Sequence, residues 1–422
     1  MMPVVGIQQS SVFSLQSSIS NLQSPLPNLQ SNMPFSPASR MQRLPVYFFQ
    51  RLNQRVAELK AQGRDVIRLD AGSPDLPPAP HIIAALEESA RNPNNHGYQN
   101  YAGNPDYRAA WAAWYGRRFG VELDAESEVL GLIGSKEGIF NLHLAMVNEG
   151  DVVLVPDPGY PPYTAGALFA GAQVVQLPLL ARNGYLPDFA ALPEETLCRA
   201  RLLWLNYPNN PTGAVASLEF FAEVVALARR YGFLIAHDAP YTEITYDGSR
   251  APSLLQVPGA REVAVEFHSL SKTYNMGGWR LGVAVGNAEV LRALATLKSN
   301  VDSGTFKAVQ AAGIAALTGD QSWTQARNEH YRRRRDLAVE ALRAAGLRVE
   351  TPPAALYLWA QLPDGVDDYT YVSELLEQTG VSLTPGSVFG PSGAGYVRVS
   401  LCLADDRLEE AMRRVKGWGS GK

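Results

Sequence analysis

The sequence predicts an α/β fold, in which a mostly parallel seven-stranded sheet carries helices on both faces and a smaller α+β domain uses both ends of the chain. Two observations lead to this prediction. Between about residues 79 and 315, short apolar runs alternate with stretches of helical length and periodicity. After residue 316, one long helical stretch precedes a few separate strand-like runs, which indicates a second packing unit.

The seven predicted strands are short runs dominated by Val, Ile and Leu, as is typical of parallel strands buried on both faces. Ligands bind at the carboxyl ends of strands in sheets of this kind, so we expect the polar residues that follow these runs to form a site. The strands are predicted at 129–133, 152–155, 174–177, 202–205, 234–237, 263–268 and 281–285.

The remaining elements set the predicted domain boundaries. Apolar spacing predicts a helix over 51–63 that ends at a glycine, and the next apolar run, 66–69, is a short strand. A long helix is predicted over 322–345, followed by strands near 355–360 and 396–401. The predicted division is an N-terminal extension (1–40), the first part of the small domain (41–78), the large domain (79–315), and a linking helix with the rest of the small domain (316–422).

The first residues differ in composition from the rest. Residues 1–39 carry no charged side chain and are rich in Ser, Gln, Asn and Pro, so the extension 1–40 is predicted to be disordered. It lacks the basic start and continuous apolar stretch of a secretory signal and the arginines of a transit peptide. We hypothesise that the extension is dispensable, or that translation begins at Met41.

Composition argues against several classes of function. A net charge of −4 with 46% apolar residues gives no case for nucleic acid or a membrane as partner. Two cysteines are too few for a disulfide framework, which favours a cytoplasmic setting. The six histidines show no paired spacing for a metal site, so no metal is expected. The basic run 332–335 is predicted to be the solvated face of the long helix.

A lysine is the most informative residue of the chain. Lys272 lies in a polar run of small residues directly after an apolar strand, where a lysine nucleophile would sit in an α/β enzyme. A lone lysine is usually a surface residue. This one has partners along the chain, in the order Asn210, Asp238, Tyr241, Lys272, Arg280 and Arg398.

In order and spacing, these residues resemble the pyridoxal-phosphate (PLP) aminotransferases of fold type I, classes I and II, from about Leu44 to the C terminus. Asp238 follows Asn210 by 28 residues and Lys272 follows it by 62, as in that family. The resemblance implies a PLP cofactor, a homodimer with shared active sites, and ping-pong transfer of an α-amino group from an L-amino acid to a 2-oxo acid.

The resemblance also assigns the catalytic roles. Lys272 is the lysine that binds the cofactor and then moves the proton at the substrate Cα, and Asp238 faces the pyridine nitrogen. Tyr241 and Asn210 hydrogen-bond the phenolic oxygen. A lysine needs desolvation and cationic neighbours to act as a base near neutral pH, and Arg280 is such a neighbour.

A phosphate cradle is predicted at 134–138, Gly-Ser-Lys-Glu-Gly, because this run follows a strand and opens a helix. Helix N-termini offer unpaired N–H groups and a positive dipole end to an anion. The resemblance implies that the phosphate is held by Ser135, Lys136, Ser269 and Arg280, and by Tyr98 of the partner subunit across the dimer interface.

The substrate side is predicted from three further residues. Tyr160 corresponds to the family aromatic that stacks on the cofactor ring, and Gly72 lets a substrate carboxylate approach the backbone. Arg398 lies in an apolar strand and resembles the arginine that grips the α-carboxylate, since its planar fork binds a carboxylate at two points. Specificity is expected from the loops 47–49, 99–102 and 387–390.

Within the family, the runs 134–138, 269–282 and 298–304 most resemble bacterial LL-diaminopimelate aminotransferases of lysine biosynthesis. An alanine or aspartate aminotransferase of the same class stays open, because these runs surround the cofactor and not the distal end of the substrate. A PLP-dependent β-lyase also stays open. A transcription regulator with an aminotransferase-like domain is disfavoured, because residues 1–39 carry no basic side chain for DNA.

Overall fold

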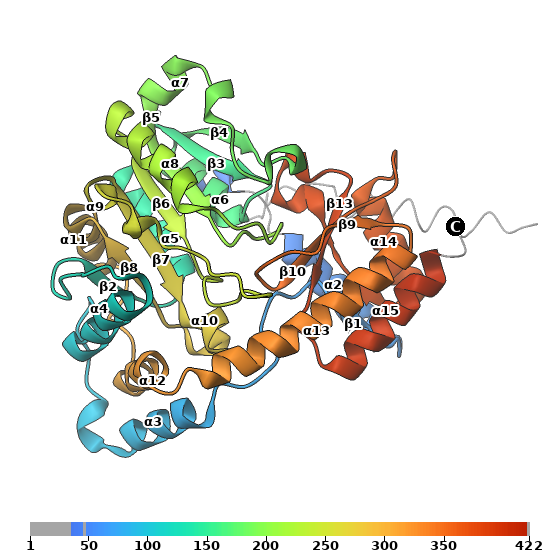
Figure 1. Ribbon diagram of the computed structural model, residues 1–422, viewed down its shortest axis with the longest axis horizontal. Coiled ribbons are helices and arrows are strands. Elements are labelled where there is room, and N and C mark those ends of the chain that lie inside the picture. Colours follow the sequence, from blue (N-terminus) through green and yellow to red (C-terminus); the bar gives the residue numbers. More distant parts are fainter. Residues whose placement is uncertain (1–34, 45–47, 420–422) are drawn as a thin grey trace, which may run out of the picture.

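The computed structural model describes residues 35–44 and 48–419, and it confirms the predicted fold class. The described part contains a seven-stranded sheet surrounded by helices and a separate four-stranded sheet, joined by one long helix (Figure 1). Residues 1–34, which make up most of the predicted disordered extension, lie outside the described residues, as does Tyr47 of the first specificity loop.

All seven predicted strands belong to the large sheet. Its order is β2 (Val129–Leu132), β8 (Gly282–Gly286), β7 (Ala264–Ser269), β6 (Leu234–Asp238), β5 (Ala200–Asn206), β3 (Val152–Asp157) and β4 (Gln173–Pro178). Neighbouring strands from β7 to β4 are parallel, and β8 alone runs antiparallel to both of its neighbours. Val263, predicted to start a strand, instead ends the short helix α9 (Ala260–Val263).

Helices cover both faces because side chains alternate along each strand. On β5, Leu202 and Trp204 pack on one face, under helices α5 (Ser135–Met146), α6 (Pro161–Ala170) and α11 (Ala288–Lys298). Leu203 and Leu205 pack on the other face, under α4 (Pro105–Phe119), α8 (Leu218–Tyr231) and α12 (Lys307–Thr318). Strands of this kind need apolar residues at every position, which explains the continuous Val and Leu runs.

The smaller part has its own sheet and core. Strands β12 (Thr384–Pro385), β13 (Tyr396–Ser400), β10 (Tyr357–Gln361) and β9 (Arg348–Val349) pair antiparallel in that order. Strand β1 (Ile67–Arg68) pairs with β11 (Val381–Ser382), so residues from both ends of the chain meet here. The helices of this part are α2 (Phe48–Ala61), α13 (Ser322–Ala344), α14 (Asp368–Thr379) and α15 (Asp405–Gly419).

Three further helices complete the arrangement. Helix α3 (Pro80–Arg91) packs against α12, and α7 (Glu194–Arg199) precedes β5. Helix α10 (Leu270–Thr273) follows β7 and carries Lys272, at the strand end where the sequence predicted it.

The basic run on α13 corrects one prediction. Arg334 and Arg335 are only 4% and 3% exposed, so the expectation of a solvated face is wrong for these two residues. Arg334 pairs with Asp75 and Asp405, and Arg335 pairs with Asp247. The carboxylates come from segments that fold over the helix, which offsets the cost of burial and which local sequence does not reveal.

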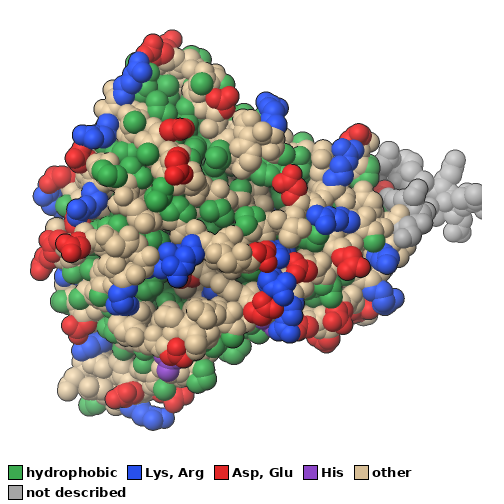
Figure 2. All heavy atoms as spheres, in the orientation of Figure 1, with side chains coloured by type: hydrophobic (Ala, Val, Ile, Leu, Met, Phe, Trp, Pro, Cys, Tyr) green, Lys and Arg blue, Asp and Glu red, His purple; other side chains and the backbone are tan. Residues whose placement is uncertain are grey.

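The surface carries charges of both signs. Figure 2 shows acidic and basic side chains interspersed over the visible face, without a large field of one sign. In the described part of the chain, no helix is long and apolar enough to cross a membrane.

Candidate active site

A pocket opens where the carboxyl ends of β5, β6 and β7 meet the smaller part of the molecule. It brings together residues that are spread over more than 300 positions of the sequence. The predicted site residues that line it are Gly72, Ser135, Lys136, Tyr160, Asn210, Asp238, Tyr241, Ser269, Lys272, Arg280 and Arg398.

Lys272 is placed by the end of strand β7. The hydroxyl of Ser269, the last residue of the strand, accepts the N–H of Ser271 at 3.1 Å and so caps helix α10. The Lys272 amino group, Nζ, donates to the backbone carbonyl of Gly72. The Lys272 amino group therefore lies between the two parts of the molecule.

Asp238 ends β6 and is almost fully buried. Its Oδ2 accepts a hydrogen bond from the Tyr163 hydroxyl at 2.7 Å, but its Oδ1 has no donor among the described residues. Burial raises the pKa of Asp238 to about 6, although the Tyr163 hydrogen bond opposes that shift. The site thus holds a carboxyl oxygen that lacks a donor and suits a cationic N–H group of a ligand.

A chain of aromatic contacts behind Asp238 fixes Tyr163. The Tyr163 ring stacks on Trp204 with centroids 4.8 Å apart and planes 11° from parallel. Trp204 Nε1 donates to His143 Nε2 at 2.9 Å, and His143 Nδ1 lies 2.9 Å from the Ile139 carbonyl. Burial lowers the pKa of His143 to about 4, so the ring is neutral and donates through Nδ1. No motif in the sequence predicted this support.

The opposite end of the pocket is cationic. Gly134 has a φ of +79°, and a Cβ added there would collide with the Arg280 guanidinium. This glycine therefore lets Arg280 reach the N-terminal end of helix α5, where N–H groups point outward. Burial, with the charge of Arg280, lowers the pKa of Lys136. Two cations and a helix N-terminus together form an anion site.

Arg398 lies in β13 and is 4% exposed. It donates to Asn210 Oδ1 at 3.0 Å and to the Asp70 carbonyl at 2.8 Å, and its Nε has no acceptor in the described part of the chain. The rings of Tyr357 and Phe389 flank the guanidinium, with centroids 4.3 Å and 4.8 Å away. A buried arginine without a carboxylate partner is suited to bind one from a ligand.

Tyr241 and Gly72 both lie against Tyr357, a pocket residue that was not predicted from the sequence. The Tyr241 hydroxyl lies 3.0 Å from the Tyr357 hydroxyl, and a Cβ on Gly72 would collide with that same Tyr357 hydroxyl. Gly72 therefore leaves room for Tyr357 at the pocket wall. Asn206, also missed, donates to the Asp238 carbonyl at 2.7 Å and accepts from the Asn210 N–H at 2.8 Å, which links these two predicted residues.

Tyr98 is the one predicted site residue that does not line this pocket. Tyr98 is 94% exposed, and Tyr101, three residues further on, is also exposed. Its assignment to the site of a partner subunit stays a prediction.

The family model for aminotransferase class I and II matches residues 64–415 of the chain. The chain belongs to this family. It is 55% identical to the LL-diaminopimelate aminotransferase of Desulforudis audaxviator over 91% of the chain and 98% of that relative, and 50% identical to that of Moorella thermoacetica over 90% and 97%.

Solved structures agree with this assignment. The substrate-bound BacF structure from Bacillus subtilis is 37% identical, covers 92% of this chain and 98% of its own, and superimposes with a TM-score of 0.88. A probable N-succinyldiaminopimelate aminotransferase from Thermus thermophilus is 39% identical, with a TM-score of 0.83 over 87% of this chain and 99% of its own.

Proposed function

We propose that the protein is a PLP-dependent aminotransferase that exchanges the α-amino group between LL-diaminopimelate and glutamate, in lysine biosynthesis. The similarity to several proteins named LL-diaminopimelate aminotransferase, across about nine-tenths of the chain, carries the substrate assignment. The pocket geometry supports the chemistry.

The pocket fits PLP at three separate points. Asp238 Oδ1, which has no donor among the described residues, suits a protonated pyridine nitrogen. The cationic end suits a phosphate, and the Lys272 amine suits an aldehyde. The cofactor would be held by Asp238, Tyr241, Asn210, Tyr160, Lys272, Ser135, Lys136, Ser269 and Arg280.

When bound, PLP supplies an electron sink for the pair of electrons left when the substrate Cα loses its proton. Asp238 serves that sink in its ionised form, because a carboxylate beside the ring nitrogen keeps that nitrogen protonated. The Tyr163 hydroxyl occupies Oδ2 and so directs Oδ1 into the pocket.

Lys272 moves the proton at the substrate Cα. With the cofactor bound, its Nζ would carry a proton between the substrate Cα and the cofactor carbon in one half of the exchange, and in the reverse direction in the other half. In the structure the Gly72 carbonyl orients this amino group.

Arg398 binds the α-carboxylate that donor and acceptor share. The Tyr357 and Phe389 rings exclude water from the guanidinium, which strengthens its interaction with a carboxylate. Phe49 and Phe389, from two of the three predicted specificity loops, line the pocket. Phe49 lies at the start of helix α2 and Phe389 in the turn Gly386–Phe389, and their position in the pocket wall supports a role of these two segments in substrate selection.

Active sites shared within a homodimer are part of the proposal. The high exposure of Tyr98 supports it, because covering an exposed aromatic ring with a second subunit removes apolar surface from water and lowers the free energy. The cytoplasmic setting expected from the sequence stays a prediction.

A half-reaction screen tests the proposed function. Single amino acids are added to the PLP-loaded protein without a 2-oxo acid, and the absorbance change from pyridoxal to pyridoxamine form is followed. Fast conversion by LL-diaminopimelate and by glutamate is expected. Conversion by alanine or aspartate alone would overturn the substrate and keep the aminotransferase, whereas release of ammonia and pyruvate from cysteine conjugates would indicate a β-lyase.

A further inference from the structure

A buried arginine on the long helix α13 has no role in the site described so far. Arg327 is 3% exposed, and no ion pair joins it to a carboxylate within the described ranges of the chain. Burial lowers the pKa of Arg327. Because burying an unpaired cation is costly, its position requires strong compensation from hydrogen-bond acceptors.

The acceptors of Arg327 include backbone carbonyls from the two segments that bear Lys272 and Tyr241. Its Nη1 donates to the carbonyl of Thr273 and reaches that of Lys272 at 3.4 Å. Its Nη2 donates to the carbonyl of Glu243 at 2.8 Å and to Asn328 Oδ1 at 2.7 Å. One guanidinium thus joins the helix that bears Lys272 to the segment that bears Tyr241.

The first contact stabilises the end of helix α10. This helix spans only Leu270–Thr273, and a helix of one turn is not stable by itself. Its last carbonyls lack partners within the helix and form the negative end of its dipole. Arg327 satisfies these carbonyls with a cation, so it fixes the turn on which the Lys272 side chain is mounted.

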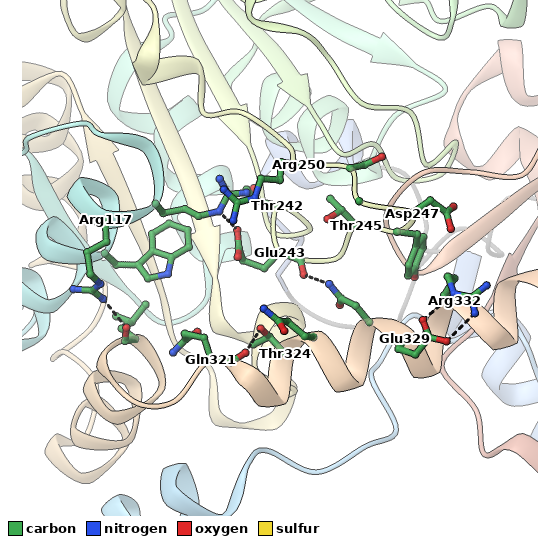
Figure 3. A pocket seen from close by; sticks show the side chains of 18 residues that line it. Arg117, Thr242, Glu243, Thr245, Asp247, Arg250, Gln321, Thr324, Glu329 and Arg332 are labelled. Carbon is green, nitrogen blue, oxygen red and sulfur yellow. Dashed lines mark hydrogen bonds and ion pairs between the residues drawn. The ribbon is translucent and has the colours of Figure 1, made fainter.

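The second contact fixes the segment after Tyr241. Glu243 is two residues further on, and its carbonyl also accepts from Asn328 Nδ2 at 2.8 Å. Figure 3 shows Thr242 and Glu243 across a polar cleft from Gln321, the residue before α13, and Thr324 of that helix. The Glu243 carboxylate pairs with Arg118 at 2.7 Å on its other side, so this segment is held from two directions.

Helix α13 makes a similar contact two turns further along. Arg334 lies seven residues after Arg327, on the same face of the helix. It donates to Asp75 at 2.7 Å and to the Leu401 carbonyl at 3.1 Å. Leu401 follows the strand of Arg398, and Asp75 follows Gly72. The helix therefore contacts each of the segments that carry the lysine, the tyrosine and the carboxylate-binding arginine.

We propose that Arg327 is a positioning residue that sets the placement of Lys272 relative to Tyr241, by bridging the carbonyl end of α10 and the carbonyl of Glu243. The inference rests on the proposed function only in taking Lys272 as the reacting lysine. The bridge itself is a property of the cofactor-free chain and can be measured there.

The test compares Arg327→Met, Arg327→Lys and Arg335→Met. Arg335 is a matched control, because it is equally buried on the same helix but donates to Asp247 and to the Pro352 carbonyl. Hydrogen exchange of residues 270–276 is measured in the cofactor-free protein, then the rate of PLP capture, and finally kcat and KM.

Arg327→Met is expected to speed exchange at 270–276, to slow PLP capture, and to lower kcat about 10- to 100-fold with a nearly unchanged KM. Arg327→Lys should recover part of the loss, because an ammonium keeps the charge but cannot span both carbonyls. Arg335→Met should leave exchange at 270–276 and PLP capture at the wild-type values.

The proposal would be overturned if Arg327→Met showed wild-type hydrogen exchange at 270–276 and a wild-type rate of PLP capture. It would also be overturned if Arg335→Met changed both quantities as much as Arg327→Met does, since equal changes would indicate a loss of overall stability alone. If Arg327→Met fails to fold, Arg327→Lys decides by the same comparison. If the wild-type protein is inactive with LL-diaminopimelate, the proposed function fails, while exchange and PLP capture still test the bridge.

Discussion

Asp238 is an almost fully buried carboxyl group whose Oδ1 has no donor among the described residues, and its replacement by asparagine gives a quantitative prediction. The pKa of Asp238 is about 6 in the folded chain, compared with 3.8 for an unperturbed aspartate. At about 1.4 kcal/mol per pKa unit, ionising it costs the folded state about 3 kcal/mol above pH 7. We expect Asp238→Asn to recover much of this free energy while abolishing transamination.

The sign of the pH dependence follows from linkage. A carboxyl group whose pKa is raised on folding holds more protons in the folded than in the unfolded state, so stability falls as pH rises from about 4 to about 6. The cost is then complete above pH 7 and roughly half as large at pH 5. The stabilising effect of Asp238→Asn should therefore grow between pH 5 and pH 8.

Urea unfolding of the cofactor-free proteins at pH 5 and pH 8 measures this effect. Glu266→Gln is the matched control, because Glu266 is equally buried in the neighbouring strand but accepts five hydrogen bonds, from Tyr115, Ser253, His237, His268 and the Leu254 N–H. Burial alone would raise the pKa of Glu266, yet the two histidines hold it below its usual range. Glu266→Gln should destabilise the protein, the opposite sign.

Two results would refute this reasoning. One is an Asp238→Asn protein that is less stable than the wild type at pH 8. The other is a stability difference between the two proteins that stays constant from pH 5 to pH 8. Either would mean that the buried carboxyl group has its hydrogen-bond partners in solution and that its Oδ1 does not require a cationic ring nitrogen.

Three further predictions concern single contacts of the site. Tyr163→Phe removes the donor to Asp238 Oδ2, and we expect a higher pKa of Asp238 and about tenfold weaker PLP binding, measured by spectral titration; unchanged affinity would contradict this. Arg398→Lys keeps the charge but loses the planar fork, so kcat/KM should fall about 100-fold for every amino donor, with a rise in KM; a loss confined to one donor would argue against the α-carboxylate role. Tyr98→Ala and Lys272→Ala subunits should each be impaired alone but recover activity when mixed, because a mixed dimer contains one complete site; no recovery would contradict a shared site.

The sequence predicted most of the fold because the large sheet is buried on both faces. Continuous apolar runs such as 152–155 and 202–205 are too short for buried helices and are typical of strands buried on both faces. The structure extends both strands by a few residues. The same pattern predicted a strand end at His268, one residue before the observed end at Ser269, and so placed Lys272 just beyond the strand.

The supporting residues could not be predicted in the same way. Tyr163 and Tyr357 look like core aromatics in apolar stretches, and only the packing of distant segments turns their hydroxyls toward Asp238 and Tyr241. Arg334 and Arg335 were misread because a run of charges normally faces water, and their partners lie about 70 to 260 positions away in sequence. Tertiary contact, rather than local pattern, decides these roles.

Borohydride reduction of the PLP-loaded protein, before and after addition of LL-diaminopimelate without a 2-oxo acid, tests the central claim most directly. Reduction fixes the cofactor to the lysine that holds it, and peptide mass spectrometry locates that lysine. We predict fixation on Lys272 before addition and its loss afterwards, because the amino group then resides on the free cofactor. Fixation on another lysine such as Lys136, or unchanged fixation on Lys272 after LL-diaminopimelate, would contradict the account.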